Sequence, residues 1–260
     1  MSFEKEGRDY IKDGILFCGV CHTPKQVKIS LFGEEKIQYC ACKCMSEKVS
    51  KDFAHVAEMT RESERLSAFP LREMGKWTFA SDTGGSPRVM ATAKKYVQNW
   101  KQMYQDNIGL LLFGDIGTGK TFAAACIANA LLDMGVSVLM TDFSRIVNDM
   151  MDFDTGNNND YIRNLNRYSL IIFDDFGVER ETRTALQYVE DVIDSRYKAK
   201  MPVVITTNKS VEEMKKEKRI EYQRIYSRIL GMTVAIQVTG NDLRKSEQAT
   251  KILAAKKLLL

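Results

Sequence analysis

Eight consecutive residues near the middle of the chain have the types and spacing of a phosphate-binding loop. They are Gly114, Asp115, Ile116, Gly117, Thr118, Gly119, Lys120 and Thr121. In such a loop the glycines let backbone N–H groups point at phosphate oxygens, the lysine reaches the β- and γ-phosphates, and the last threonine ligates Mg²⁺. The apolar run 110–113 and the helix-forming run 122–134 flank it, as the motif requires. The sequence therefore predicts a site for a nucleotide and Mg²⁺.

A pair of carboxylates follows a second apolar run, residues 170–173. Asp174 and Asp175 would stand at the end of a buried strand, where ionised carboxylates have to be matched by a cation. We expect Asp174 to hold Mg²⁺ together with Thr121. We expect Asp175 to orient or deprotonate the attacking water.

Polar residues in two later segments are further candidates. Asn208 follows the apolar run 203–207, and it either holds the same water, senses the γ-phosphate or caps the next helix. A helix is expected over 220–230, ending at Gly231, with Arg224 and Arg228 one turn apart on one face. Surface arginines are usually only solubilising, so these two matter for chemistry only if another subunit's nucleotide lies opposite them.

Five of the six cysteines lie close together near the start of the chain, namely Cys18, Cys21, Cys40, Cys42 and Cys44. The first two form a CxxC pair, and residues 25–39 alternate apolar and polar side chains, which predicts a hairpin between two thiolate pairs. Zn²⁺ prefers four soft ligands in a tetrahedron, and so short a segment has too little apolar area to fold without such a metal.

We therefore expect a zinc ribbon that uses Cys18 and Cys21 with two of Cys40, Cys42 and Cys44. The spacing does not choose between the later three, since CxC and CxxxC are both geometrically acceptable. His22 is a weaker candidate ligand, and free cysteines in a disordered leader are the alternative. The sixth cysteine, Cys126, is expected in the core.

Apolar runs alternate with helical stretches through the rest of the chain, and five strands are predicted at 110–113, 136–140, 170–173, 203–207 and 233–238. Continuous apolarity in the four runs from 136–140 to 233–238 indicates strands covered on both faces. The predicted fold class is therefore α/β, doubly wound, with a five-stranded parallel sheet between helix layers and a small zinc-ribbon domain before it. One of the helices is expected over 88–105.

The predicted domains are a zinc ribbon over 1–47, a charged helical connector over 48–75 and the nucleotide-binding domain over 76–260. Trp77 and Phe79 stand near the entry to the last domain. They either flank an adenine ring or, as aromatic residues at domain edges more often do, anchor the packing.

The chain has 260 residues, of which 44% are hydrophobic and 28% charged, with a net charge of +4. These are values of a globular protein, and the charge is too small to argue nucleic-acid binding from the overall balance. No apolar run approaches the roughly 20 residues of a membrane span, and the N-terminus lacks the apolar core of a signal peptide. We expect a cytoplasmic protein without a membrane partner, whose cysteines serve a metal rather than disulfides.

The order of the motifs resembles the DnaC/DnaI helicase-loader branch of the AAA+ ATPases, also called the IstB-like ATP-binding branch, of bacterial or phage origin. The resemblance covers about residues 77–244 and is carried by the segments 114–121, 171–177, 205–208, 226–229 and 239–244. It implies an AAA+ domain that binds ATP with Mg²⁺. It also implies Asn208 as first sensor, Arg228 as an arginine finger acting in a neighbouring subunit, and Arg244 as a second-sensor-like residue.

Two features depart from AAA+ enzymes at large. Asp175 stands where glutamate is usual, which favours slow hydrolysis and a switch-like use of ATP, and no typical helical lid follows Arg244. Should Arg228 not be the finger, Arg224 and Arg196 are the next candidates.

The function implied by the resemblance is that of an ATP-dependent helicase loader in DNA replication. Such a protein would assemble with ATP, hold single-stranded DNA and deliver a replicative helicase of the DnaB type, with the zinc ribbon docking on the helicase. Its hydrolysis of ATP would be slow and stimulated by DNA or the partner. The alternatives are an ATP-switched adaptor with little turnover and an IstB-like transposition helper, for which a zinc ribbon would be superfluous.

Overall fold

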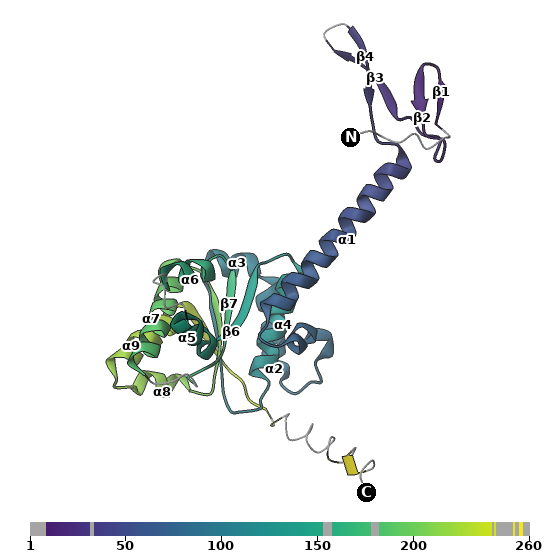
Figure 1. Ribbon diagram of the computed structural model, residues 1–260. Coiled ribbons are helices and arrows are strands. Elements are labelled where there is room, and N and C mark those ends of the chain that lie inside the picture. The colour runs from purple at the N-terminus through teal and green to yellow at the C-terminus, as the bar shows by residue number, and fades with distance from the viewer. Residues whose placement is uncertain are drawn as a thin grey trace. The chain divides into compact units, whose positions relative to one another are not determined.

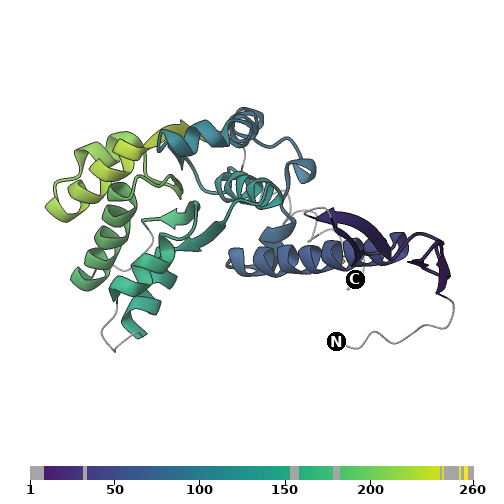
Figure 2. The same cartoon turned by 90° about the horizontal axis from the view of Figure 1, so that it is seen from above.

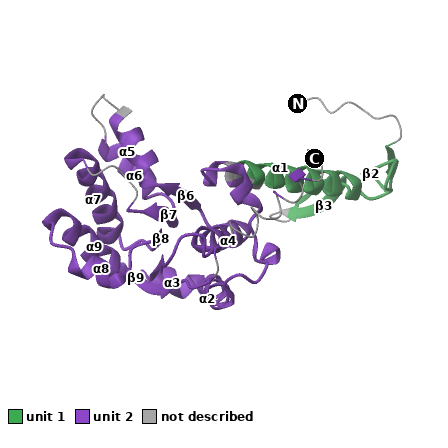
Figure 3. Cartoon of the chain, turned by 90° about the horizontal axis from the view of Figure 1, so that it is seen from below, with its two compact units in different colours: residues 1–63 green, residues 64–260 purple. Residues whose placement is uncertain are grey.

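The computed structural model describes residues 9–31, 34–152, 158–177 and 182–240 and the single positions 242, 252, 255 and 256. The chain divides into two compact units, residues 1–63 and 64–260 (Figure 3). Within the described part of the chain, no helix combines the length and the apolarity needed to cross a membrane.

Unit 1 begins with two antiparallel hairpins and continues into a long helix (Figure 1). Its elements are β1 (Tyr10–Lys12), β2 (Ile15–Phe17), β3 (Gln26–Leu31), β4 (Glu34–Tyr39) and most of α1 (Lys43–Ala68). Asp13 and Gly14 both have positive φ between β1 and β2, which is the conformation that a two-residue hairpin turn needs. The pairing of β3 with β4 confirms the hairpin predicted over 25–39.

The described residues of the two hairpins in unit 1 form no hydrophobic core. Among the described residues from 9 to 63, only Cys18 and Cys42 are buried, and every residue of β4 is exposed. Large apolar side chains such as Ile11 and Tyr39 lie open to solvent, 74% and 71% exposed. A segment of this size therefore depends on something other than apolar burial for its stability.

Unit 2 contains the predicted five-stranded parallel sheet, in the order β6-β7-β8-β5-β9. Its strands are β5 (Gly109–Phe113), β6 (Val138–Asp142), β7 (Leu170–Phe176), β8 (Val203–Thr207) and β9 (Thr233–Gln237). The strand before the phosphate loop, β5, lies between β8 and β9, and the strand with the paired carboxylates, β7, is the other neighbour of β8. All carboxyl ends of these strands therefore meet at one edge of the sheet.

Helices cover both faces of this sheet (Figures 1 and 2). They are η1 (Arg72–Lys76), η2 (Phe79–Ser81), α2 (Pro87–Gln98), α3 (Trp100–Gln105), α4 (Lys120–Asp133), α5 (Phe143–Asp152), α6 (Asn158–Leu165), α7 (Arg183–Lys198), α8 (Val211–Lys216) and α9 (Ile220–Met232). The layer with α2, α3 and α4 packs on one face, and the layer with α5, α7 and α9 on the other.

Alternate residues of β5 enter the two cores. Leu110 and Leu112 belong to the core on the α4 side, and Leu111 belongs to the core on the α7 side. All three are at most 4% exposed. Because side chains alternate across a strand, a strand covered on both faces reads as one unbroken apolar run, and this is the reason why the sequence revealed the sheet.

Two helix boundaries differ from the sequence predictions. The helix expected over 88–105 is divided at Asn99, whose φ of −103° and ψ of 18° are not helical. The predicted helix end at Gly231 is wrong, because α9 continues through this glycine and leads directly into β9. Gly231 lies close to α7, where a Cβ would come within 3.5 Å of the Tyr197 ring. The Thr233 hydroxyl donates to the carbonyl oxygen of Ile229 at the true end.

Arg196 is the largest fully buried side chain of unit 2, at 0% exposure. Its guanidinium donates to the carbonyl oxygens of Tyr168 and Pro202, both at 2.8 Å, and of Ser169 at 3.4 Å. Burial lowers the pKa of Arg196 to about 10. The residue joins the end of α7 to the segments that enter β7 and β8. The prediction of Arg196 as an alternative arginine finger is therefore wrong, because a fully buried side chain cannot reach another subunit.

Replacing Arg196 by leucine is expected to lower the free energy of unfolding by about 2–4 kcal/mol, because three backbone acceptors lose their donor. Urea denaturation followed by circular dichroism measures this change. Arg163→Leu is the control, since Arg163 is 78% exposed and its ion pair is with Asp160 of the same helix, so its loss should cost less than about 0.5 kcal/mol. Equal midpoints for the two variants would contradict this role of Arg196.

Candidate functional site

The phosphate loop connects β5, which lies between β8 and β9, to α4. Gly114, Gly117 and Gly119 in this loop have positive φ. A Cβ at Gly114 would lie 2.2 Å from the carbonyl oxygen of Val238, and one at Gly117 would lie 1.9 Å from Oδ1 of Asp242. At Gly114 the obstacle is backbone, which cannot move aside, so the close approach requires glycine as well as the positive φ does; at Gly117 the obstacle is a side chain, and the positive φ is the stricter requirement.

Lys120 begins α4 and is only 5% exposed. Its Nζ donates to the carbonyl oxygens of Gly114 at 2.8 Å and Asp115 at 2.7 Å. The loop is braced by the Thr118 hydroxyl, which donates to Asp115 O, and by the Ser86 hydroxyl, which donates to Thr118 O, both at 2.8 Å. The Lys120 ammonium group is thus held inside the loop by neutral carbonyl oxygens. A phosphate oxygen is charged and would be a stronger hydrogen-bond acceptor for it.

Asp174 is the fifth residue of β7 and only 8% exposed. Burial raises the pKa of this carboxyl group, and the neighbouring Asp175 raises it further, whereas hydrogen bonds from Thr206 and Thr121 lower it. The Thr206 hydroxyl donates to Asp174 Oδ1 at 2.6 Å. The structure thus brings Asp174 and Thr121, the two predicted Mg²⁺ ligands, into contact. A divalent cation held by these two oxygens would offset the cost of burying the carboxylate.

Asp175 lies one residue further along β7 in a very different environment. The pairing of β7 with β8 shifts register between Phe173 and Phe176, and Asp175 has a φ of 51°. Such a bulge redirects side chains, so Asp175 is exposed while Asp174 is buried. A buried carboxylate suits a metal ligand, and an exposed one suits contact with a water molecule or a substrate.

Thr206 of β8 is a site residue that the sequence analysis missed. Its hydroxyl group donates to the Asp174 carboxylate and accepts the backbone N–H of Asp175 at 2.9 Å, so one side chain contacts the carboxylate of one aspartate and the backbone of the next. Thr206 is 0% exposed. The only sequence signal was a hydroxyl residue at the end of an otherwise apolar strand.

A pocket of about 330 Å³ opens beside the two carboxylates. Its polar lining includes Asp142, Arg145, Asp174 and Asp175. The Arg145 guanidinium lies 3.5 Å from an Asp142 oxygen and donates to the carbonyl oxygen of Pro70 at 3.2 Å. Arg145 is a second residue that the sequence analysis missed, and it places a positive charge in the pocket that Asp174 and Asp175 line.

The remaining predicted site residues differ in their placement. Asn208 follows β8 and is exposed at the same sheet edge as the carboxylates. Arg228 lies on α9, where its described partners are Glu190 and Asp194 of α7 rather than residues of the phosphate loop. Arg244 lies outside the described residues. The predicted role of Arg228 therefore requires a neighbouring subunit.

Trp77 and Phe79 pack against the core on the α4 side. The Trp77 ring lies 5.9 Å from the Phe122 ring, and its carbonyl oxygen accepts a hydrogen bond from Asn129. The Lys94 ammonium lies 5.7 Å from the centre of the Phe79 ring. These contacts are those of packing anchors, which was the more common of the two roles considered.

The second candidate site is a cluster of four cysteine sulfurs in unit 1. The Sγ atoms of Cys18, Cys21, Cys42 and Cys44 all lie within 4.8 Å of one another. Cys40 stays outside this cluster and points its sulfur at the carbonyl oxygen of Pro24, 3.5 Å away. Tertiary structure thus favours the CxC pair, which the spacing alone left open. Cys126 is fully buried in α4, as expected for a core residue.

The chemistry of the four thiols fits a soft divalent metal. A hydrogen bond with the Thr23 hydroxyl lowers the pKa of Cys21 to about 5. Hydrogen bonds with Cys42, Cys21 and Cys18 raise the pKa of Cys44 to about 12. Four thiolates at this spacing would repel one another without a cation, and four sulfurs around one point match the tetrahedral preference of Zn²⁺. These cysteines could hold a metal, which would supply the cohesion that the hairpins lack.

The parallel sheet, the phosphate loop after β5 and the paired carboxylates in β7 define a P-loop protein with an AAA+ fold. The chain belongs to the family of IstB-like ATP binding proteins, whose model matches residues 45–251. The four clustered cysteines precede this match.

One curated relative is the replicative helicase loader DnaC of Escherichia coli (strain K12), 29% identical over 164 residues. The match covers 61% of this chain and 65% of DnaC, which is less than two thirds of the relative's length. A crystal structure of the DnaC helicase loader has a TM-score of 0.54 at 19% identity and covers 65% of this chain and 100% of its own. AMPPCP-bound DnaA from Aquifex aeolicus also has a TM-score of 0.54, at 16% identity, and covers 73% and 57%. These structures share the fold.

Purified protein is expected to carry about one Zn²⁺, since structural zinc sites bind with about 10–16 kcal/mol of apparent free energy at neutral pH. Cys42→Ser should release the metal, because it removes one of four clustered ligands. Metal analysis by mass spectrometry measures the content. Cys40→Ser is the matched control and should retain zinc. Loss from both variants alike, or no zinc in protein prepared without chelator, would count against the cluster as a zinc site.

Proposed function

We propose that this protein is an ATP-dependent helicase loader, which binds ATP and hydrolyses it slowly at the sheet edge described above. The observation that carries the proposal is the convergence of Lys120, Thr121, Asp174 and Asp175 from α4 and β7. Membership of an ATP-binding family and the similarity to DnaC, named a replicative helicase loader, support it.

The residues take separate roles in the proposed reaction. The N–H groups of the phosphate loop and the Lys120 ammonium bind the β- and γ-phosphates. Thr121 and Asp174 would hold Mg²⁺, which when bound neutralises charge on the phosphates. Asp175 orients the attacking water, and Thr206 holds Asp174 and the backbone of Asp175 in place for these tasks.

The slow rate follows from the length of Asp175. Its carboxylate reaches one methylene less far than a glutamate would, so the water it orients is held less favourably for attack on the γ-phosphate. Asn208 stands at the same edge and is the candidate sensor of that phosphate. Arg228 of a neighbouring subunit would complete the site by stabilising charge on the transferred group.

The partners follow from the two units. We propose that residues 1–47 form a zinc ribbon that docks on a replicative helicase of the DnaB type, that 48–75 connect it, and that 76–260 form the ATPase domain. The exposed apolar side chains of unit 1, among them Ile11, Tyr39 and Phe53 at 71–74% exposure, support a docking role. Single-stranded DNA and further copies of the chain would bind the ATPase domain, in the cytoplasm.

Two alternatives have specific support. Asp175 in place of the longer glutamate favours an ATP-switched adaptor with little turnover. The family match favours an IstB-like transposition helper, but it begins at residue 45, so it leaves the clustered cysteines unexplained. The helicase loader accounts for both units.

Lys120→Ala is expected to weaken ATP binding at least about tenfold, because the phosphates lose their buried cation, whereas Asp175→Asn should still bind ATP and lose about 10²–10⁴-fold in turnover. Fluorescent-nucleotide titration and phosphate release, with and without single-stranded DNA and helicase, separate these effects. Lys101→Ala, at an exposed position of α3, is the control. Equal turnover in Asp175→Asn and wild type would reject the catalytic role, and no wild-type turnover under any condition would favour the adaptor.

Arg228→Ala is expected to bind ATP normally and lose about 10³–10⁵-fold in hydrolysis if it acts in a neighbouring site. Mixing Arg228→Ala with Lys120→Ala should restore part of the activity, because one variant supplies an intact nucleotide site and the other an intact arginine. Phosphate release from mixtures of known ratio measures the recovery. A mixture that co-assembles in light scattering and stays inactive would show that Arg228 is not a finger acting between subunits.

A further inference from the structure

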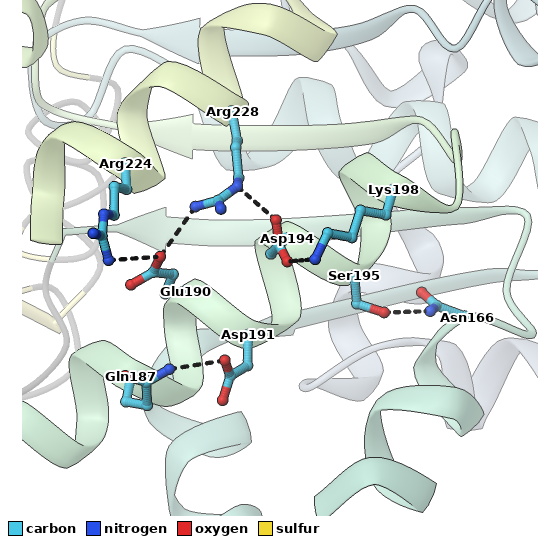
Figure 4. A network of polar contacts seen from close by, with 9 residues as sticks. All are labelled: Asn166, Gln187, Glu190, Asp191, Asp194, Ser195, Lys198, Arg224 and Arg228. Atoms are coloured by element: carbon cyan, nitrogen blue, oxygen red, sulfur yellow. Dashed lines mark hydrogen bonds and ion pairs between the residues drawn. The ribbon is translucent and has the colours of Figure 1, made fainter.

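Arg228 is held by two carboxylates of its own subunit. Its Nη1 lies 3.2 Å from Oε1 of Glu190, and its Nε lies 2.7 Å from Oδ1 of Asp194, one turn further along α7 (Figure 4). The side chains of Arg228, Glu190 and Asp194 are 26%, 16% and 20% exposed. These are therefore half-buried ion pairs, which solvent screens less than exposed ones.

The two carboxylates differ in their other partners. Oδ2 of Asp194 lies 2.6 Å from Nζ of Lys198, so this carboxylate is bound at both oxygens. Oε1 of Glu190 is shared between Arg228 and the more distant Arg224, whose Nη1 is 3.9 Å away. Asp194 is thus the firmly held partner of Arg228, and Glu190 the more weakly held one.

The two carboxylates also bind different parts of the guanidinium. Asp194 binds Nε, which fixes the plane of the group from the side of the helix. Glu190 binds Nη1, one of the two terminal nitrogens, and these nitrogens are the ones that reach furthest toward a phosphate outside the subunit. A phosphate that approaches Arg228 therefore competes with Glu190 while Asp194 can remain in place.

We propose that Glu190 restrains Arg228 in the unassembled subunit and is displaced from Nη1 by the triphosphate of a neighbouring copy, with Asp194 as the anchor that keeps Arg228 oriented. This inference rests on the proposed role of Arg228 between subunits. Glu190 and Asp194 are then positioning residues with opposite effects on the hydrolysis that Arg228 supports in the neighbouring subunit. Loss of the Glu190 charge frees Nη1, whereas loss of the Asp194 charge lets the whole guanidinium move.

The test places each substitution on one partner of the complementing mixture. Glu190→Gln, which keeps the size of the side chain and removes its charge, is combined with Lys120→Ala, the chain that supplies the arginine. Recovered phosphate release should rise about two- to fivefold, the worth of one such ion pair. The same substitution on the Arg228→Ala chain should change nothing, because that chain supplies no arginine.

Two further variants on the arginine-supplying chain complete the experiment. Asp194→Asn should lower the recovered activity by at least about twofold, and it remains informative if Glu190→Gln fails to fold. Asp191→Asn is the matched control and should have no effect, since Asp191 lies on the same helix and accepts a hydrogen bond from Gln187 at 2.9 Å (Figure 4).

The outcomes separate this inference from the function on which it rests. The restraint is overturned, and the finger is left intact, if the mixture recovers activity but two results are seen. Glu190→Gln leaves the recovered activity unchanged or lowers it, and Asp194→Asn has no effect on it. An equal rise with Glu190→Gln on either chain overturns it too, because it points to a general change in assembly. A mixture without any recovery overturns both the finger and the restraint.

Discussion

The burial of two opposite charges at one edge of a parallel sheet is the constraint on which the nucleotide site depends. Lys120 and Asp174 are 5% and 8% exposed, and a charge so far from water has to be matched by close polar partners. Carbonyl oxygens of the phosphate loop match the lysine, and the hydroxyl groups of Thr121 and Thr206 match the aspartate. The two charges and their partners come from β7, from β8 and from the segment that follows β5, so the parallel order of the sheet has to be in place before the site exists.

Unit 1 follows a different principle, because it has almost no apolar interior. Four sulfurs stand where a small domain would otherwise place its core, and the hairpins expose most of their large apolar side chains. A segment held together by a metal can leave its apolar surface free for a partner, whereas a segment that must bury that surface to fold cannot. A metal bound by the four thiolates would thus supply the cohesion of unit 1 and leave its apolar side chains exposed.

The ion pairs between α7 and α9 lie outside the nucleotide site, and they bear on its chemistry through the role proposed for Arg228. Arg228 faces Glu190 and Asp194 of its own chain, which stabilises the packing of the two helices. The same contacts determine which nitrogen atoms of the guanidinium are occupied. In the proposed function Arg228 acts between subunits and has to be kept in position before the subunits meet, and a carboxylate pair of unequal strength would do this.

The sequence alone determined the sheet, the phosphate loop and the carboxylate pair, because each is encoded by neighbouring residues: apolar runs covered on both faces, glycines with positive φ, and two acids after a buried strand. Tertiary structure alone decided that Cys42 and Cys44 rather than Cys40 join the cluster, that Thr206 links Asp174 to Asp175, and that α9 passes through Gly231. Tertiary structure also buries Arg196, which excludes this residue as an arginine finger. These contacts join residues far apart in the chain, and spacing carries no information on which distant side chains a fold brings together.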